Sequence, residues 1–267
     1  MADFVQALPL YLALGAVAGL LAGLLGIGGG LIIVPALLFI FEQQNIATYQ
    51  PMHLALGTSL ASIVMTSLSS IYAHHRHHAI DWSAFKQLTP GILLGSYLGA
   101  WLATDLSSHT LQPIFAVFEI AVGIYMISGF KPRQHHTQCN TAPHILSGGF
   151  IGAISAIVGI GGGTLSVPYL LWRGKNIHQA IATSAACGLP IAVAASTSYR
   201  VNGWSAQITN NTWGYIYLPA LLGIILSSVL FAPLGARLAH TLPISQLKKV
   251  FAIFLLLIGS QLLFNRF

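Results

Sequence analysis

The sequence predicts an all-α polytopic membrane protein made of two inverted repeats, each a glycine-broken helical hairpin followed by three transmembrane helices. Composition is the first observation: 55% of the 267 residues are hydrophobic and only 6% are charged, whereas a soluble domain carries roughly 25% charged residues. A glycine-rich motif that occurs twice is the second, and a one-sided distribution of Lys and Arg is the third. This composition argues against a soluble enzyme, a nucleic-acid-binding protein and a disordered chain.

Eight apolar runs separated by polar breaks give the expected helical elements in order. Six of them are 15 to 22 residues long, which suits a helix crossing a hydrocarbon core of ~30 Å at ~1.5 Å per residue. The first and fifth runs have 35 and 28 residues and are too long for one crossing. The runs are about Ala7–Phe41, Met52–Ala73, Leu88–Ala103, Leu111–Phe130, Ile145–Trp172, Ala180–Tyr199, Trp213–Leu234 and Val250–Phe264.

Both long runs contain the same interruption. Gly26–Gly30 and Gly159–Gly163 each have the sequence GIGGG, and each is followed by a proline, Pro35 or Pro168. Glycine costs about 1 kcal/mol per residue inside a helix, so this cluster predicts a break or hairpin in each run. A helix-packing face is the alternative, and it suits glycines spaced four apart rather than consecutive ones. The first run has such a spaced set at Gly15, Gly19 and Gly23.

The two long runs belong to an internal repeat. A shift of 133 residues aligns Gly15–Phe39 with Gly148–Trp172, and eleven of the 25 positions are identical. A Thr-Ser pair follows each copy, as Thr58-Ser59 and as Thr183-Ser184. We expect a first membrane repeat over residues 1–130, a cytoplasmic connector over 131–143 and a second repeat over 144–267.

The positions of Lys and Arg favour opposite orientations for the two repeats. If every run crosses once, the eleven cations divide six to five between the two sides. If the two long runs return to the side from which they entered, nine cations lie on one side and two on the other. Only this arrangement follows the positive-inside tendency. It predicts an internal connector and external termini.

The doubled motif resembles the TauE/SafE sulfite exporter (TSUP) family of bacterial membrane transporters. The resemblance rests on G-x3-G-x6-GIGGG-x4-P in both copies, on the Thr-Ser pair after each, and on the segments Ala73–Trp82 and Gly95–Ala100. It implies a multi-pass protein of the bacterial inner membrane that moves small sulfur-containing anions, such as sulfite or organosulfonates, or organic acids. We expect a secondary transporter working by alternating access, coupled to protons or sodium or driven by the solute gradient. A passive anion channel is the alternative.

Other classes of function are not expected. The apolar runs hold neither paired Asp residues nor a deeply buried His, so an intramembrane protease is disfavoured. No ATP-binding G-x4-G-K-[ST] motif occurs. We expect no cofactor, no bound metal and no nucleic-acid partner, whereas the lipid bilayer is an obligatory partner. A homo-oligomer stays open.

The expected substrate site combines freed backbone N–H groups at the two breaks with nearby hydroxyls. Helix starts carry partial positive charge and bind anions without a buried lysine. Interhelical or backbone hydrogen bonding is the alternative role for the hydroxyls. The candidate residues are Gly26, Ile27, Gly28, Gly29, Gly30, Thr58, Ser59, Gly159, Ile160, Gly161, Gly162, Gly163, Thr164, Thr183 and Ser184.

Three further features carry weaker hypotheses. Glu119 is the one carboxylate deep in an apolar run, so it is a coupling candidate; a neutral glutamic acid bridging two helices is the alternative. The histidines at positions 74, 75, 77 and 78 suit an interfacial or anion-attracting role better than a metal site. Arg200 suits an interfacial anchor better than an anion vestibule.

Overall fold

The computed structural model describes residues 2–44, 46, 49–129, 141–206, 211–239 and 244–264. These residues form ten α-helices and no strand beyond one isolated bridge between Thr212 and Tyr217. Residues 131–140 of the expected connector lie outside the described residues. The helices are α1 (Ala2–Leu25), α2 (Gly30–Gln43), α3 (Pro51–Arg76), α4 (Trp82–Asp105), α5 (Ser108–Ser128), α6 (Thr141–Val158), α7 (Gly163–Trp172), α8 (Ile177–Asn202), α9 (Leu218–Leu238) and α10 (Ile244–Phe264).

Both predicted helix breaks are confirmed, because each long apolar run is divided at its glycine cluster. The first break separates α1 from α2 and has three glycines with positive φ: Gly26 at +70°, Gly28 at +76° and Gly29 at +78°. The second separates α6 from α7, with Gly159 at +73° and Gly162 at +79°. Residues with a side chain rarely adopt positive φ, so the consecutive glycines allow the chain to reverse at each break.

The prolines do not make the breaks. Pro35 and Pro168 lie inside α2 and α7, each five residues after the first helical glycine. A proline lacks the N–H that would bond to the carbonyl four residues earlier, so it weakens the ladder within the short helix that follows each break.

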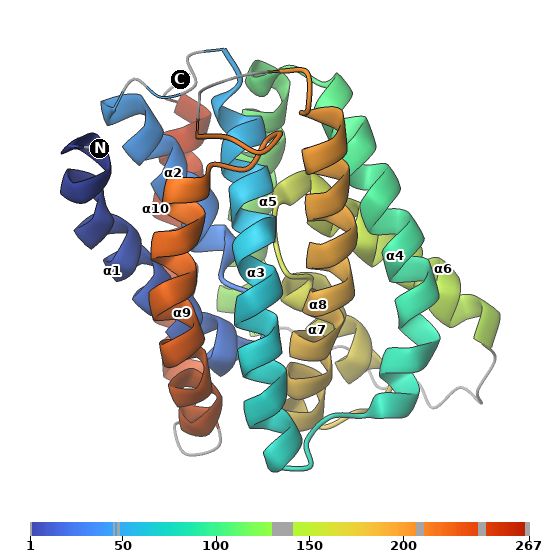
Figure 1. The fold of residues 1–267 in the computed structure, drawn as a ribbon. Helices are drawn as coiled ribbons and strands as arrows, with labels where there is room; N and C mark the ends of the chain where they lie inside the picture. Colours follow the sequence, from blue (N-terminus) through green and yellow to red (C-terminus); the bar gives the residue numbers. More distant parts are fainter. Residues whose placement is uncertain are drawn as a thin grey trace.

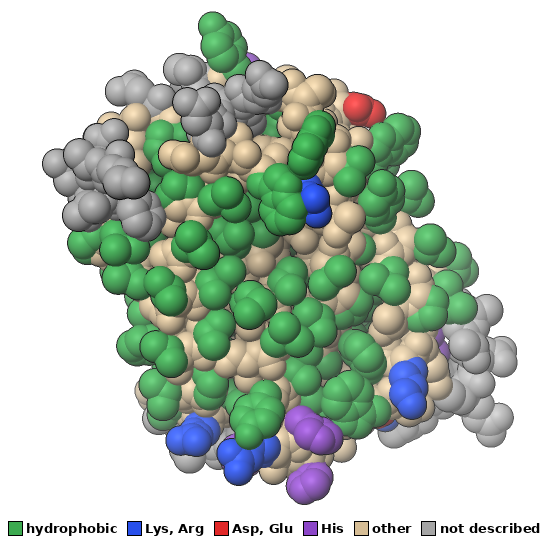
Figure 2. All heavy atoms as spheres, in the orientation of Figure 1, with side chains coloured by type: hydrophobic (Ala, Val, Ile, Leu, Met, Phe, Trp, Pro, Cys, Tyr) green, Lys and Arg blue, Asp and Glu red, His purple; other side chains and the backbone are tan. Residues whose placement is uncertain are grey.

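The chain runs up and down through the bundle (Figure 1). α1 starts and α2 ends near the upper end of this view, whereas α7 ends and α8 starts near the lower end. Both ends of the chain lie near the upper end. Apolar side chains cover the middle of the surface, and Lys, Arg and His side chains gather along its lower edge (Figure 2).

Five helices are long and apolar enough to cross a membrane within the described residues. They are Ala7–Leu25, Pro51–Arg76, Ser108–Ser128, Ile177–Asn202 and Leu218–Leu238. The two helices that flank the first break differ in length, since α1 has 24 residues and α2 has 14. This difference follows from the place of Gly26–Gly30 in the run Ala7–Phe41, because the cluster lies nearer the end of the run than its start.

The spaced glycines make close helix contacts. Along α1, a Cβ on Gly19 would lie 2.7 Å from the Cα of Ser228 on α9. Along α4, a Cβ on Gly99 would lie 2.7 Å from the Cα of Ala153 on α6. The packing-face interpretation of Gly15, Gly19 and Gly23 is therefore confirmed, because each of these glycines packs against the backbone of α9.

Candidate functional site

The two glycine breaks touch each other backbone to backbone. A Cβ on Gly28 would lie 2.7 Å from the Cα of Gly161, and a Cβ on Gly161 would lie 2.9 Å from the Cα of Gly28. Real Cβ atoms essentially never come this close to another atom, so a side chain at either position would push the breaks apart. We call this contact the glycine crossing, defined by residues 26–30 and 159–163.

The first helical glycines complete the crossing. A Cβ on Gly30 would lie 2.8 Å from the Cα of Ile160 and would overlap the carbonyl of Gly159. A Cβ on Gly163 would overlap the carbonyl of Gly26 and the Cα of Ile27. The start of each returning helix therefore packs directly on the opposite break.

The crossing places two helix starts close together. In α2, the N–H groups of Ile32 and Ile33 donate to the carbonyl of Gly29 at 3.0 and 3.1 Å. In α7, Leu165 and Ser166 donate in the same way to Gly162. The N–H groups of Gly30 and Gly163 precede these bonds, and the first N–H groups of a helix have no acceptor within it. Such groups carry partial positive charge.

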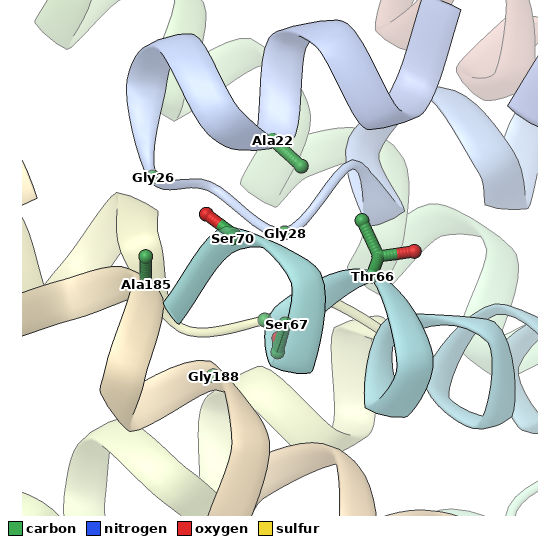
Figure 3. A pocket seen from close by; sticks show the side chains of 9 residues that line it. Ala22, Gly26, Gly28, Thr66, Ser67, Ser70, Ala185 and Gly188 are labelled. Carbon is green, nitrogen blue, oxygen red and sulfur yellow. The ribbon is translucent and has the colours of Figure 1, made fainter. Parts of the chain in front are cut away.

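A small cavity of about 10 Å³ lies beside the crossing (Figure 3). This volume is close to that needed for a single water molecule. The cavity takes residues from both breaks and from the middle of α3 and α8. Its lining consists of Ala22, Gly26, Gly28, Thr66, Ser67, Ser70, Gly161, Ala185 and Gly188.

Ser70 is the notable polar group of this cavity. Its side chain is 1% exposed, and its hydroxyl has no hydrogen-bond partner among the described residues. In Figure 3 the hydroxyl points toward the Gly26–Gly28 segment. Thr66 differs, because its hydroxyl lies 3.0 Å from the carbonyl of Ser62 and 2.8 Å from the hydroxyl of Ser228. Leaving a buried hydroxyl unpaired costs free energy, so Ser70 is a candidate ligand group.

The sequence pointed to hydroxyls on α3 but selected different ones. Ser70 and Ser67 were missed, although Ser59, Ser62, Thr66 and Ser70 recur at intervals of three or four residues. Residues at this spacing share one face of a helix. This row of hydroxyl residues on one helix face could have identified Ser70 from the sequence.

Two of the predicted threonines, Thr58 and Thr183, have backbone partners instead. Thr58 Oγ1 accepts the N–H of Tyr217 at 2.9 Å, just before α9. Thr183 Oγ1 accepts the N–H of Asp81 at 2.9 Å, just before α4. Each threonine thus fixes the start of another helix, which is the alternative role that the sequence left open.

The predicted serines differ from each other. Ser59 Oγ donates to the carbonyl of Gly159 at 2.9 Å and thereby ties α3 to the second break. Ser184 is fully buried, and its hydroxyl has no partner among the described residues. The isoleucines of the motif, Ile27 and Ile160, are buried in the hydrophobic core.

A second cavity of about 50 Å³ also takes residues from the crossing. Ile27 and Gly163 contribute to it, together with Thr164, whose buried hydroxyl has no partner among the described residues. The remaining walls are largely apolar, and Lys248 of α10 is the cationic member of the lining.

Glu119 lies outside the first cavity. It is fully buried on α5, and neither carboxyl oxygen has a hydrogen-bond partner among the described residues. Val122, one helical turn further along α5, lines the second cavity.

The histidine segment and Arg200 pack against aromatic or backbone groups. His74 Nε2 lies 3.2 Å from the carbonyl of Gly23, and His75 packs edge-on against Trp82. No group of three or more potential metal ligands occurs in the part of the chain that the structure describes. The guanidinium of Arg200 lies 3.5 Å from the ring centre of Trp213, a cation–π contact that suits an interfacial anchor.

Comparison with known proteins identifies the family. The model of the family "Sulfite exporter TauE/SafE" matches residues 11–262. A "Probable membrane transporter protein" of Haemophilus influenzae is 40% identical over 95% of this chain and 97% of its own length. A relative with the same description in Methanocaldococcus jannaschii is 32% identical over 87% of this chain and 84% of its own. A relative in Bacillus subtilis is 26% identical over 94% of this chain and 96% of its own length.

No solved structure matches the chain. The five candidate spans and the family agree that this is a multi-pass protein of the cell's inner membrane. The family match covers both glycine breaks and nearly all of the described helices, so the chain belongs to the TauE/SafE sulfite exporter family.

Proposed function

We propose that this protein is a secondary transporter of a small oxyanion, with sulfite and organosulfonates as the leading candidates, and that the anion binds at the glycine crossing. The observation that carries this proposal is the contact between two helix breaks beside a cavity lined by Ser70, whose hydroxyl has no partner in the described part of the chain. N–H groups at helix starts compensate an anion for lost water without a buried cation. The family description supports the sulfur-containing class.

Two inverted repeats form this transporter. Support comes from contacts that recur when each residue is exchanged for its counterpart 133 positions away. Gly28 contacts its own counterpart, Gly161, and Gly30 packs on Gly159 as Gly163 packs on Gly26. A two-fold relation produces such reciprocal pairs.

The helices support the same relation. α1 packs on α9, and α6, its counterpart, packs on α4, the counterpart of α9. Thr58 holds the start of α9 as Thr183 holds the start of α4. Each repeat therefore contributes a broken helix to the other repeat.

Transport proceeds by alternating access. The cavity beside the crossing has room for about one water molecule, so a larger anion enters only when the two repeats move apart. The two repeats would move as rigid units at their glycine contacts, because closely packed interfaces switch between discrete arrangements rather than deforming continuously.

Glu119 is the proposed proton-coupling group. A buried carboxyl without a hydrogen-bond partner is far less costly in its neutral form than in its ionised form. Movement of the repeats that admits water to α5 would allow its proton to leave. Glu119 is thereby a group whose charge can follow the conformation.

The transport test uses purified protein in proteoliposomes with radiolabelled sulfite, and with thiosulfate, sulfoacetate, taurine and acetate as competitors. We expect saturable counterflow of sulfite or an organosulfonate. Single-channel currents without counterflow would instead identify a passive anion channel. Absence of transport and of competition for every one of these anions would refute the proposed substrate class.

Ser70→Ala tests the binding site. We expect the apparent substrate affinity to fall about 10- to 100-fold, as for the loss of one hydrogen bond to a charged acceptor. Thermal stability should stay the same or rise, because the folded protein loses an unpaired buried hydroxyl. Ser260→Ala is the matched control, since that hydroxyl donates to the carbonyl of Leu257 within α10. Equal affinity in both variants would remove Ser70 from the site.

Glu119→Gln tests the coupling. The amide cannot release a proton, so we expect counterflow to persist while uptake driven by a pH gradient is lost. A variant that still concentrates substrate on a pH gradient would exclude Glu119 as the coupling group. Dependence on a sodium gradient instead would identify sodium as the coupling ion.

A further inference from the structure

An open groove of about 410 Å³ runs between α6 and α7 on the outer surface of the bundle. Its six lining residues are Leu146, Ser147, Phe150, Ile151, Leu165 and Tyr169. Leu146 is 76% exposed and Phe150 is 67% exposed. In a membrane protein these side chains face lipid, so the groove offers an apolar channel to a lipid chain.

A chain of three polar side chains lies next to this groove. The hydroxyl of Tyr169, which lines the groove, is 2.9 Å from Nδ1 of His144. Nε2 of His144 is 2.8 Å from a guanidinium nitrogen of Arg173. Arg173 follows Tyr169 by one turn, directly after the last residue of α7.

The hydrogen-bonding roles within this chain follow from the arginine. A guanidinium only donates, so Nε2 of His144 accepts and carries no proton. The single proton of the neutral ring is then on Nδ1, which donates to the Tyr169 oxygen. The Tyr169 hydroxyl hydrogen and the remaining N–H groups of Arg173 are consequently left to donate elsewhere.

Asp81 pairs with Lys175 rather than with Tyr169 or Arg173. Among the described residues, the single ion pair joins Lys175 to Asp81, and no carboxylate forms an ion pair with Arg173. Tyr169 and Arg173 therefore offer hydrogen-bond donors and one positive charge beside the groove, with no carboxylate paired to Arg173 among the described residues.

We infer that the groove between α6 and α7 binds an anionic phospholipid, with its phosphate on Arg173 and Tyr169 and one acyl chain along Leu146 and Phe150. Arginine binds phosphate through two parallel hydrogen bonds. Basic pockets between transmembrane helices are a recurrent binding place for anionic headgroups. This site lies apart from the glycine crossing and goes beyond the proposed transport function.

A lipid fits better than free phosphate for two reasons. The groove is lined mainly by apolar side chains. On a surface that faces the bilayer, an acyl chain does not compete with water for such a groove. Trp172, which is 40% exposed, lies between Tyr169 and Arg173 in the chain, and tryptophan favours the level of the headgroups.

The experiment measures lipid binding to the delipidated, detergent-purified full chain by native mass spectrometry and by thermal unfolding. Phosphatidylglycerol and phosphatidylcholine with identical acyl chains are compared, and inorganic phosphate is a third arm. We expect phosphatidylglycerol to bind more tightly and to raise the unfolding temperature more than phosphatidylcholine. Inorganic phosphate should have no effect at the same concentration.

Variants locate the site. Arg173→Gln should weaken phosphatidylglycerol binding roughly tenfold, the loss expected for a charge-assisted hydrogen bond, and leave phosphatidylcholine binding unchanged. Tyr169→Phe should weaken it less, and Arg173→Lys should retain part of the preference because the charge remains. Arg237→Gln is the control, since Arg237 is an exposed cation at the end of another helix, α9.

Three outcomes would overturn the inference. Equal binding of the two lipids would show an apolar groove without headgroup recognition. Equal losses in Arg173→Gln and Arg237→Gln would show general surface charge, and stabilisation by inorganic phosphate would show an anion site rather than a lipid site. None of these measurements depends on transport, so the result stands or falls separately from the proposed function.

Discussion

The two glycine breaks have the same five-residue sequence but different surroundings. Beside the first cavity, α3 contributes the hydroxyl residues Thr66, Ser67 and Ser70. The corresponding positions of α8, 125 residues later, are Ile191, Ala192 and Ala195. The backbones of the two breaks differ as well, because Gly28 has positive φ whereas the matching Gly161 does not. The hydroxyl side chains that line the cavity all come from α3. The same glycine motif is therefore surrounded by different polar side chains at its two positions.

The serines next to the breaks differ in the same way. Ser59 donates to the carbonyl of Gly159 in the second break, whereas Ser184, the matching residue, has no partner among the described residues. The second break is therefore tied to α3 by a side chain, and the first break depends on backbone packing alone at this position. The following predictions compare the two sides.

The largest expected effect comes from adding a methyl group at the crossing. Gly28→Ala should lower the free energy of unfolding by about 2–4 kcal/mol, because alanine is strained at positive φ and overfills the contact with Gly161. Gly161→Ala should cost less, about 1–3 kcal/mol, since Gly161 has no positive φ and only overpacking remains. Denaturant unfolding in detergent measures both.

Gly149→Ala is the control for this pair. A Cβ there would lie 3.7 Å from the carbonyl of Gly91, an ordinary contact. If Gly28→Ala were as stable as Gly149→Ala, the crossing would not be tightly packed, and the argument for a binding site between the breaks would fail.

An intermediate effect separates the two serines. Ser59→Ala should lower the free energy of unfolding by about 1–3 kcal/mol, because the buried carbonyl of Gly159 loses its donor. Ser184→Ala should be neutral or slightly stabilising, since no hydrogen bond is lost. Paired thermal melts of the two variants test this contrast. Equal destabilisation would mean that Ser184 has a partner and that the two breaks are held alike.

The smallest effect concerns the starts of α4 and α9. Asp81 caps α4 by accepting from the N–H groups of Ser83 and Ala84, whereas Tyr217 gives α9 no side-chain cap. Burial raises the pKa of Asp81, but its hydrogen bond to Lys175 and these amides outweigh burial and place the pKa below its ordinary value. The cap therefore stabilises the protein above the ordinary aspartate pKa, and this contribution is lost as the pH falls through the lowered value.

Asp81→Asn checks this sign. The variant should be less stable than the parent protein at neutral pH, and the difference should shrink as the pH falls below the ordinary aspartate range. Because the pair with Lys175 is partly exposed, added salt should reduce the difference as well. A difference that is independent of pH would assign the effect of Asp81 to its neutral hydrogen bonds.

Much of this fold could be predicted from local chemistry. The glycine clusters identified both breaks because consecutive glycines disfavour a helix whatever surrounds them. The spaced glycines Gly15, Gly19 and Gly23 identified a packing face because a helix brings every fourth residue to one side. The unequal arms of the first break also follow from the sequence, since Gly26–Gly30 lies nearer the end of the run Ala7–Phe41 than its start.

The candidate site was predicted less completely. The Thr-Ser pairs were correctly identified as repeated, but a repeated hydroxyl can equally hold a helix start, as Thr58 and Thr183 do. Ser70 lies eleven residues beyond Ser59, with no counterpart in the other repeat. Only its burial beside a break, without a partner, distinguishes it from the other serines of α3.

The sequence by itself determined the membrane setting and the two breaks, because these depend on composition and on the backbone freedom of glycine. The tertiary structure decided which surfaces meet: that Gly28 faces Gly161, that Ser59 has a hydrogen-bond partner whereas Ser70 has none among the described residues, and that Arg173 lies 2.8 Å from His144. The physical reason is that a hydrogen-bond partner or a close contact between distant segments depends on how helices pack, which short-range patterns along the chain do not encode.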